Sequence, residues 1–455
     1  MCVVRIFAAI AAVAGVLLGS MSPSSAADAE TVVFDATRYV IQAGRHSRFA
    51  VFQNNLQTAL ARCGSQHRVF ATGAAPDGKF DEPTRAAIRR VVECTPDNPH
   101  LRGGAARQGV LTLGVWRAIM GDGPPPTVEE RARALVLSFE ATDFGDAPLW
   151  NLCQDGTRAR YGPSNRNRAA FQCFNESDPC SFLTWGPRGA TAGSGREIQH
   201  VLWMAAQRDP QLLQRAFGTE YANIDRFIRL KGGSAGQCDG DVPLKKFICA
   251  IWMDPIRRVN WETALAALGH EPMIRRAYDQ LYALREFDGA KLERFYALWQ
   301  RLGLTPSEVD YAYFIDRITH LGGPPDDNGF TEKLTSCLAG ETSAVSVNGA
   351  ARRCASRLQP HTTQPDLRAA RDVAFYLDSY PEGALTVGEI RAWASYVPLS
   401  ATLNFALSDS APHASQPAAD LGSLGAALPD ASGTELTDHE RTACPPSVLS
   451  PDRRR

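Results

Sequence analysis

The chain has 455 residues, enough for two or three domains, and its 48 Lys and Arg residues almost balance its 49 Asp and Glu residues. A formal net charge of −1 excludes a global electrostatic attraction to phosphate backbones, so we expect no nucleic-acid partner.

The N-terminal residues 1–27 have the pattern of a secretory signal peptide. Arg5 precedes the apolar run IFAAIAAVAGVLLG, and small residues follow up to a plausible cleavage point near Ala26 or Ala27. The run is shorter than the about 20 apolar residues that a membrane-spanning helix requires. We therefore expect a periplasmic or secreted protein, with no stable membrane insertion once the signal is removed.

Cysteine usage agrees with export. Of the 11 cysteines, Cys2 would leave with the signal, and the even number that remains favours disulfides in an oxidising compartment. No Cys-x-x-Cys cluster with a neighbouring His is present, so we expect no metal site. Sequence proximity suggests the pairs Cys63 with Cys94, Cys238 with Cys249 and Cys337 with Cys354, and leaves Cys153, Cys173, Cys180 and Cys444 unassigned.

Residues 45–122 form a candidate helical module. Gly78 permits a turn, Asp81 or Thr84 can cap the helix that follows, and Phe80 can be buried beneath both. The Leu-Gln pair in FAVFQNNLQTALARCG and the turn DGKFDEPT resemble the three-helix peptidoglycan-binding domain. That resemblance implies a cell-wall glycan partner. The long connection 64–77 and the Cys63 and Cys94 pair depart from the family pattern, and a generic helical module is the alternative.

A second helix is predicted over TVEERARALVLSFE, after a PPP separator. Thr127 and Glu130 make a capping box, and apolar residues recur on one face. Glu140 ends this helix, one turn after Val136 and Leu137. Apolar neighbours disfavour an ionised carboxylate and raise its pKa, which a general acid requires. A solvated surface Glu is the alternative.

An acidic loop, a short strand and another helix follow Glu140. The strand-like LTWG segment resembles the YTIGIG type of the phage-type lysozymes, and DGTRARYG resembles the DGRGYTGG of chitosanases. Together these elements resemble the lysozyme-like superfamily over residues 127–200 and, more generally, the helices up to 323. An insertion over 163–182 departs from the family pattern.

The resemblance implies a mainly α (α+β) catalytic domain over 127–323 that cleaves peptidoglycan or a related amino-sugar polymer. Glu140 would be the acid, Asp155 or failing it Asp146 the second carboxylate, and Thr184 would position water. No cofactor is implied, because carboxylates and water suffice. Glu197 opens the next helix, where stabilisation by the helix dipole is a likelier role than catalysis. The expected substrate contacts are Tyr161, Trp185 and Arg188.

The remaining chain carries less chemistry. We expect the aromatic residues between 252 and 299 to be mostly core, and His200, His270 and His320 to be isolated. Residues 327–407 suggest a helical subdomain of unknown role, and 408–455 have a composition typical of disorder. Three alternatives to a muramidase-like hydrolase stay open: a lytic transglycosylase, a chitosanase-like or chitinase-like glycosidase, and a non-catalytic wall-binding or scaffold protein.

Overall fold

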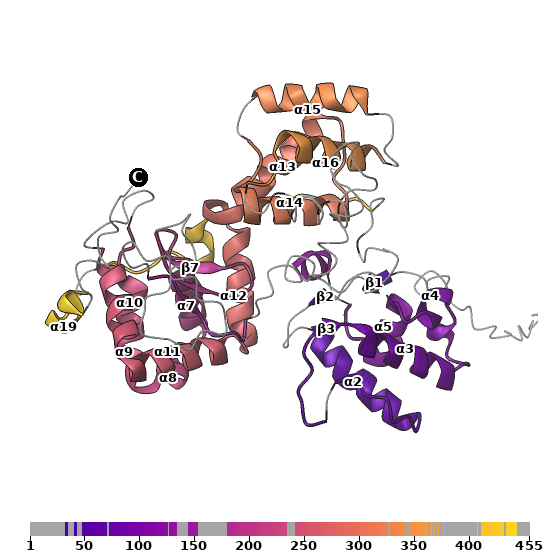
Figure 1. The fold of residues 1–455 in the computed structure, drawn as a ribbon, viewed down its shortest axis with the longest axis horizontal. Coiled ribbons are helices and arrows are strands. Elements are labelled where there is room, and N and C mark those ends of the chain that lie inside the picture. The colour runs from indigo at the N-terminus through magenta and orange to yellow at the C-terminus, as the bar shows by residue number, and fades with distance from the viewer. Residues whose placement is uncertain are drawn as a thin grey trace, which may run out of the picture.

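The structure is a computed structural model, and it is mainly helical with short antiparallel strands, as expected for an α-rich α+β protein (Figure 1). Among the described residues, no helix has both the length and the apolar character needed to cross a membrane. The structure describes residues 32–34, 41–42, 48–70, 72–125, 127–133, 144–152, 180–233, 242–325, 328–341, 346–362, 365, 368, 372, 376, 407, 411–431 and 434–443.

The first group of elements contains the expected helical module, and it begins earlier than residue 45. Strand β1 pairs antiparallel with β4, and β2 pairs antiparallel with β3, so residues before the first helix belong to this group. Pairing between strands so distant in sequence leaves no local pattern. The elements are β1 (Val32–Phe34), β2 (Ile41–Gln42), α2 (Arg48–Arg62), β3 (Lys79–Phe80), α3 (Glu82–Cys94), η1 (Pro99–Leu101), α4 (Gly104–Arg107), β4 (Leu111–Thr112) and α5 (Leu113–Met120).

The turn before α3 is built as the sequence predicts. Gly78 has φ +70°, Phe80 is fully buried, and Asp81 Oδ1 accepts a hydrogen bond from the Thr84 amide at 3.2 Å. The buried Gln53 side chain accepts from the Gly78 amide and donates to the Lys79 carbonyl, both at 2.9 Å. The predicted Cys63–Cys94 disulfide is confirmed and joins the end of α2 to the end of α3.

The second group places a small sheet beside helix α7. Strands β5, β6 and β7 form an antiparallel sheet in that order, with Leu149 opposite Thr184 and Thr184 opposite Thr191. The group buries one continuous apolar core. Its elements are β5 (Leu149–Trp150), β6 (Ser181–Trp185), β7 (Ala190–Gly193), α7 (Glu197–Arg208), α8 (Pro210–Phe217), η2 (Gly218–Glu220), α9 (Tyr221–Arg229), α10 (Pro243–Met253), α11 (Pro255–Leu268) and α12 (Pro272–Ala283).

The third group crosses the boundary expected between 323 and 327. It consists of η3 (Arg285–Gly289), α13 (Ala290–Arg301), α14 (Glu308–Leu321), α15 (Asn328–Gly340) and α16 (Val347–Leu358), and Figure 1 shows the last four helices together. Phe295 and Phe314 share a core with Leu334. Gly322, at φ +76°, ends α14, so the Gly-Gly-Pro-Pro run lies between two helices that share this core. The predicted Cys337–Cys354 disulfide is confirmed.

Much of the C-terminal segment is packed against the body, although its composition suggested disorder. Pro412 bridges Ser307, the Ala426 carbonyl lies 2.7 Å from His200 Nδ1, and η4 (Leu421–Leu424) and α19 (Asp438–Thr442) are regular. We name residues 411–431 and 434–443 the C-terminal strap. A few specific anchors hold the strap on surfaces that the other groups form, and composition does not reveal such anchors.

The expected core role of the aromatic residues is confirmed at Trp252, Trp261, Tyr278, Tyr296 and Trp299, each at most 5% exposed. Tyr282 is only partly buried and lines a cavity. Cys180 and Cys249 are also disulfide-bonded. The expected partner of Cys249, Cys238, lies outside the described residues, as do Cys444 and residues 1–27, the predicted signal peptide.

Candidate functional site

The described helix start at residues 127–133, which precedes Glu140 in the sequence, is held by a cap at its N-terminus and by two ion pairs. The predicted capping box is confirmed, because the Thr127 amide donates to Glu130 Oε2 at 2.9 Å and the Glu130 amide donates to Thr127 Oγ1 at 3.2 Å. Arg131 Nη2 lies 3.3 Å from Glu308 on α14, and Arg133 forms an ion pair with Asp279 on α12. Burial opposes the charge of Arg133, but Asp279, Glu130 and Tyr311 together raise the guanidinium pKa.

A cavity of about 290 Å³ lies where this helix start meets α12, α13, α14 and the turn between β6 and β7. It combines apolar and tyrosine side chains with charged groups. That mixture suits a ligand whose faces are apolar and whose edges are polar, as a sugar ring is. The lining residues are Thr127, Glu129, Glu130, Ala132, Arg133, Arg188, Asp279, Tyr282, Ala283, Leu292, Tyr311 and Ile315.

Arg188 reaches this cavity from the β6–β7 turn. The Tyr278 hydroxyl accepts hydrogen bonds from the amides of Arg188, at 3.0 Å, and Ala190, at 3.2 Å. The guanidinium pairs with Asp288 and lies 4.3 Å from the centre of the Tyr282 ring. Gly186 is required in this turn, because its φ is +80° and a Cβ would lie 2.8 Å from the Tyr278 ring. The predicted binding residue Arg188 therefore lines the cavity.

Glu129 supplies a carboxylate that stays ionised at the cavity. His413 of the C-terminal strap places Nε2 at 3.3 Å from Glu129 Oε1, and this hydrogen bond lowers the pKa of Glu129 to about 2. An acid that is already ionised cannot donate a proton near neutral pH. Glu129 can therefore stabilise positive charge in the cavity, but it cannot act as the general acid. Burial and the charge of Glu129 together raise the pKa of Tyr311 to about 12, so this phenol stays protonated.

Glu197, in contrast to Glu129, has a raised pKa. It lies in the first turn of α7, as expected, and its Oε2 accepts hydrogen bonds from the amide (2.7 Å) and hydroxyl of Thr191 on β7. Burial raises the pKa of Glu197 above its usual value, and the charge of Asp288 adds to this shift. The sequence favours a helix-dipole role for this residue. The signal that points to a site is a carboxylate two residues after the Gly-Ser-Gly run that links a strand to a helix.

The other predicted site residues divide between the described and the undescribed parts of the chain. Thr184 on β6 contacts the Asn151 amide nitrogen and lies 3.3 Å from Ser181 Oγ, so its described partners are neutral. Asp146 is exposed on the loop before β5. Trp185 is 2% exposed within the second core, so the structure gives its indole a packing role in place of a sugar contact. Glu140, Asp155 and Tyr161 lie outside the described residues.

Comparison with known proteins does not identify a family or a function, so the function has to be inferred from the site. No family model matches the chain, and neither a curated protein nor a solved structure matches it. The arrangement to be explained is a tyrosine-lined cavity with an ionised carboxylate on one side, and a nearby buried carboxyl with a raised pKa on α7.

Proposed function

We propose that this protein is an exported peptidoglycan glycan-strand hydrolase of the muramidase type. The observation that carries the proposal is the cavity where the helix start at residues 127–133 meets the turn of the three-stranded sheet, with Arg188 and Tyr282 in its wall. A helix and a small sheet that meet at one cavity are what the lysozyme-like reading requires. The first group would bring the enzyme to the wall, and a secretory signal would deliver it there.

In this mechanism Glu140 donates a proton to the glycosidic oxygen. Asp155, or failing it Asp146, activates water or stabilises the positively charged sugar, and Thr184 orients the water. Arg188 and Tyr282, whose guanidinium and ring stack on each other, form the part of the wall against which the sugar lies. Glu129, ionised through its bond to His413, favours positive charge in the same cavity. The chemistry requires no cofactor.

The deciding experiment is digestion of purified peptidoglycan by the exported full chain and by Glu140→Gln, with the products resolved by mass. We expect reducing muropeptides from the parent protein and a rate at least about 100-fold lower from the variant, because general acid catalysis contributes that much or more. Glu332→Gln, an exposed carboxyl on α15, is the control and should digest as the parent does. If both the parent and Glu140→Gln bind the wall and release nothing, the protein is a non-catalytic wall-binding protein.

A lytic transglycosylase is the second candidate, and the surroundings of Thr184 favour it. This reaction needs one carboxyl, and the described partners of Thr184 are the neutral Asn151 and Ser181, with Asp146 exposed. Anhydro-sugar products from the parent protein, lost in Glu140→Gln, would assign the protein to this class. Faster release from soluble glucosamine polymers than from peptidoglycan would instead assign a chitosanase.

A further inference from the structure

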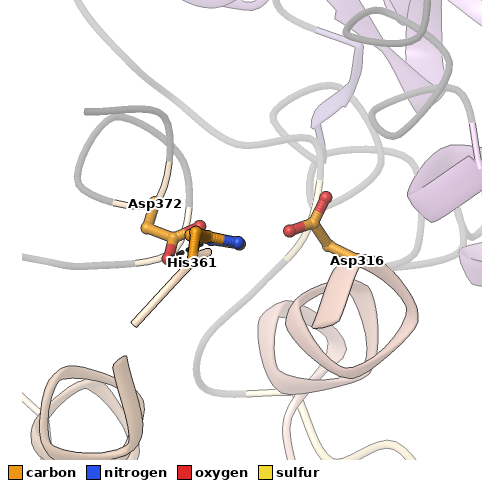
Figure 2. A group of neighbouring side chains, drawn as sticks. All are labelled: Asp316, His361 and Asp372. Carbon is orange, nitrogen blue, oxygen red and sulfur yellow. Dashed lines mark hydrogen bonds and ion pairs between the residues drawn. The ribbon is translucent and has the colours of Figure 1, made fainter. Parts of the chain in front are cut away.

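Four side chains with metal-ligating atoms meet in a buried part of the third group, away from the cavity described above. Ligand atoms of Asp316, His361 and Asp372 all lie within 4.8 Å of one another, and Figure 2 shows Asp316 on its helix facing the other two. His320 Nε2 lies 3.4 Å from Asp316 Oδ1. We propose that these four residues bind one divalent transition-metal ion of the Zn²⁺ class. The proposal does not depend on the proposed function.

The chain brings these ligands together in two ways. Asp316 and His320 are four residues apart on α14, so their side chains lie on the same face of the helix. His361 follows the end of α16, and its Nε2 lies 3.0 Å from Asp372 Oδ2. The rings of His320 and His361 meet edge to face, with centres 6.2 Å apart. His320, expected to be isolated, is therefore a member of this cluster.

The chemical types of the four ligating side chains indicate which class of metal ion they would bind. Two imidazoles and two carboxylates make four ligands, which matches the tetrahedral coordination that Zn²⁺ takes. Ca²⁺ takes at least about six oxygen ligands and Mg²⁺ prefers oxygen, whereas imidazole suits Zn, Cu, Fe and Ni. At Zn–ligand distances of about 2.1 Å, tetrahedral ligand atoms lie about 3.4 Å apart. The ligand atoms of Asp316, His361 and Asp372, which lie within 4.8 Å of one another, would therefore have to move closer by side-chain rotation, and the His320 ring would have to turn toward them.

Arg317 is the group that competes with a metal. Its Nη1 lies 3.2 Å from His361 Nε2 and its Nη2 lies 3.6 Å from Asp372, while its Nε donates to the Tyr313 hydroxyl at 2.9 Å. Metal coordination by His361 Nε2 would displace the first contact and leave the other two. Asp316 and Asp372 are both buried carboxylates, so a divalent ion between them would bind two negative charges that are shielded from water.

The burial of the ligands points to a structural site. Structural zinc sites are closed, whereas catalytic sites keep one position open to water. Here Asp316, His361 and Asp372 are buried, and 7% of the His320 side chain is exposed. A metal here would tie α14 to the segment after α16. Helix α14 also carries Tyr311 and Ile315, which line the cavity, so the ion would stiffen one of its walls.

The test is metal binding by the full chain without a histidine tag. We expect one Zn²⁺ per chain after equilibrium dialysis, and Co²⁺ should give the intense visible absorption of four-coordinate cobalt. Asp316→Asn and His361→Gln should each weaken binding at least about 100-fold, since loss of a ligand exceeds the 10–100-fold cost of losing an outer partner. Asp310→Asn is the matched control, because Asp310 is equally buried on α14 but pairs with Arg352 at 2.6 Å. It should keep one Zn²⁺ per chain.

Two results would overturn the proposal. One is a parent protein that binds no Zn²⁺, or only six-coordinate Co²⁺ with weak absorption. The other is unchanged binding by both ligand variants. In either case the protein accommodates the two buried carboxylates without a metal. If a ligand variant fails to fold, the cobalt spectrum of the parent protein decides by itself.

Discussion

At the scale of single residues, the surroundings of Glu197 and Glu129 shift the pKa values of these two glutamates in opposite directions. Glu129 lies beside His413, and that contact lowers its pKa to about 2. Glu197 is the first residue of α7 and accepts a hydrogen bond from Thr191 on β7. Burial raises its pKa above the usual value. If Glu140 proves dispensable for digestion, Glu197 is the described carboxyl best suited to hold the catalytic proton.

The raised pKa of Glu197 predicts the sign of a pH effect on stability. The folded state binds this proton more tightly than the unfolded state, so the wild-type protein loses stability as pH rises from the unfolded pKa through the folded one. Glu197→Gln keeps an acceptor for Thr191 without the charge. We expect it to match the wild type in acid and to equal or exceed its stability at pH 8, measured by thermal unfolding at both pH values.

Glu220→Gln is the matched control for that experiment. Glu220 accepts hydrogen bonds from Arg257 at 3.1 Å and from Trp261 Nε1 at 3.2 Å, so its charge is needed. We expect this variant to lose about 1.5–3 kcal/mol at pH 8, the cost of a charge-assisted bond. A comparable loss in Glu197→Gln would mean that the ionised form of Glu197 is stabilised, against our interpretation.

At the scale of elements, the second group depends on close backbone contacts at the end of the sheet. A Cβ on Gly193, the last residue of β7, would lie 1.7 Å from the Cys180 carbonyl oxygen. A Cβ on Gly232 would lie 1.9 Å from the Gly193 carbonyl oxygen. Three segments therefore meet at Gly193 with no room for a side chain. This contact fixes the end of β7 just before α7, which begins at Glu197.

We predict that Gly193→Ala destabilises the protein by about 3 kcal/mol or more, because backbone atoms cannot yield as a flexible side chain does. Gly104→Ala is the control, since nothing lies within 4 Å of a Cβ there. It should be neutral or stabilising by about 0.4–1 kcal/mol. Urea unfolding measures both, and a Gly193→Ala protein as stable as the wild type would contradict the packing of β7 described above.

At the scale of the whole molecule, the C-terminal strap connects groups that lie far apart in sequence. His413 contacts Glu129 and Tyr296, Ala426 contacts His200, and Glu440 accepts hydrogen bonds from both terminal nitrogens of Arg226, at 3.0 and 2.6 Å. Glu440 is 3% exposed, and despite the opposing effect of burial the bond to Arg226 lowers its pKa. The strap thus contributes to the stability of the second group.

Arg226→Ala should therefore cost about 2–3 kcal/mol, because it leaves a buried carboxylate without its partner. It should also make the strap a preferred site of limited proteolysis. Arg441→Ala removes an exposed pairing with Glu435, at 3.7 Å, and should change stability by less than about 0.5 kcal/mol. Equal thermal midpoints for the two variants would show that the strap is not anchored through Arg226.

The sequence by itself determined the local structural features of this protein, such as helix caps, turns and short-range disulfides. The capping box at Thr127, the turn and cap before α3, and two disulfides between cysteines close in sequence could all be predicted, because their partners lie nearby along the chain. Helices and core aromatics were predictable for the same reason, since amphipathic spacing is a local property.

Only the tertiary structure decided which distant groups meet. Arg188 and Asp288 are 100 residues apart, the strap belongs to a segment whose composition suggested disorder, and Asp316 and His320 gain the partners His361 and Asp372 from beyond α16. The candidate cavity likewise takes its wall from five separate segments. Local composition carries no record of these pairings, because each depends on the relative positions of elements that only packing of the cores establishes.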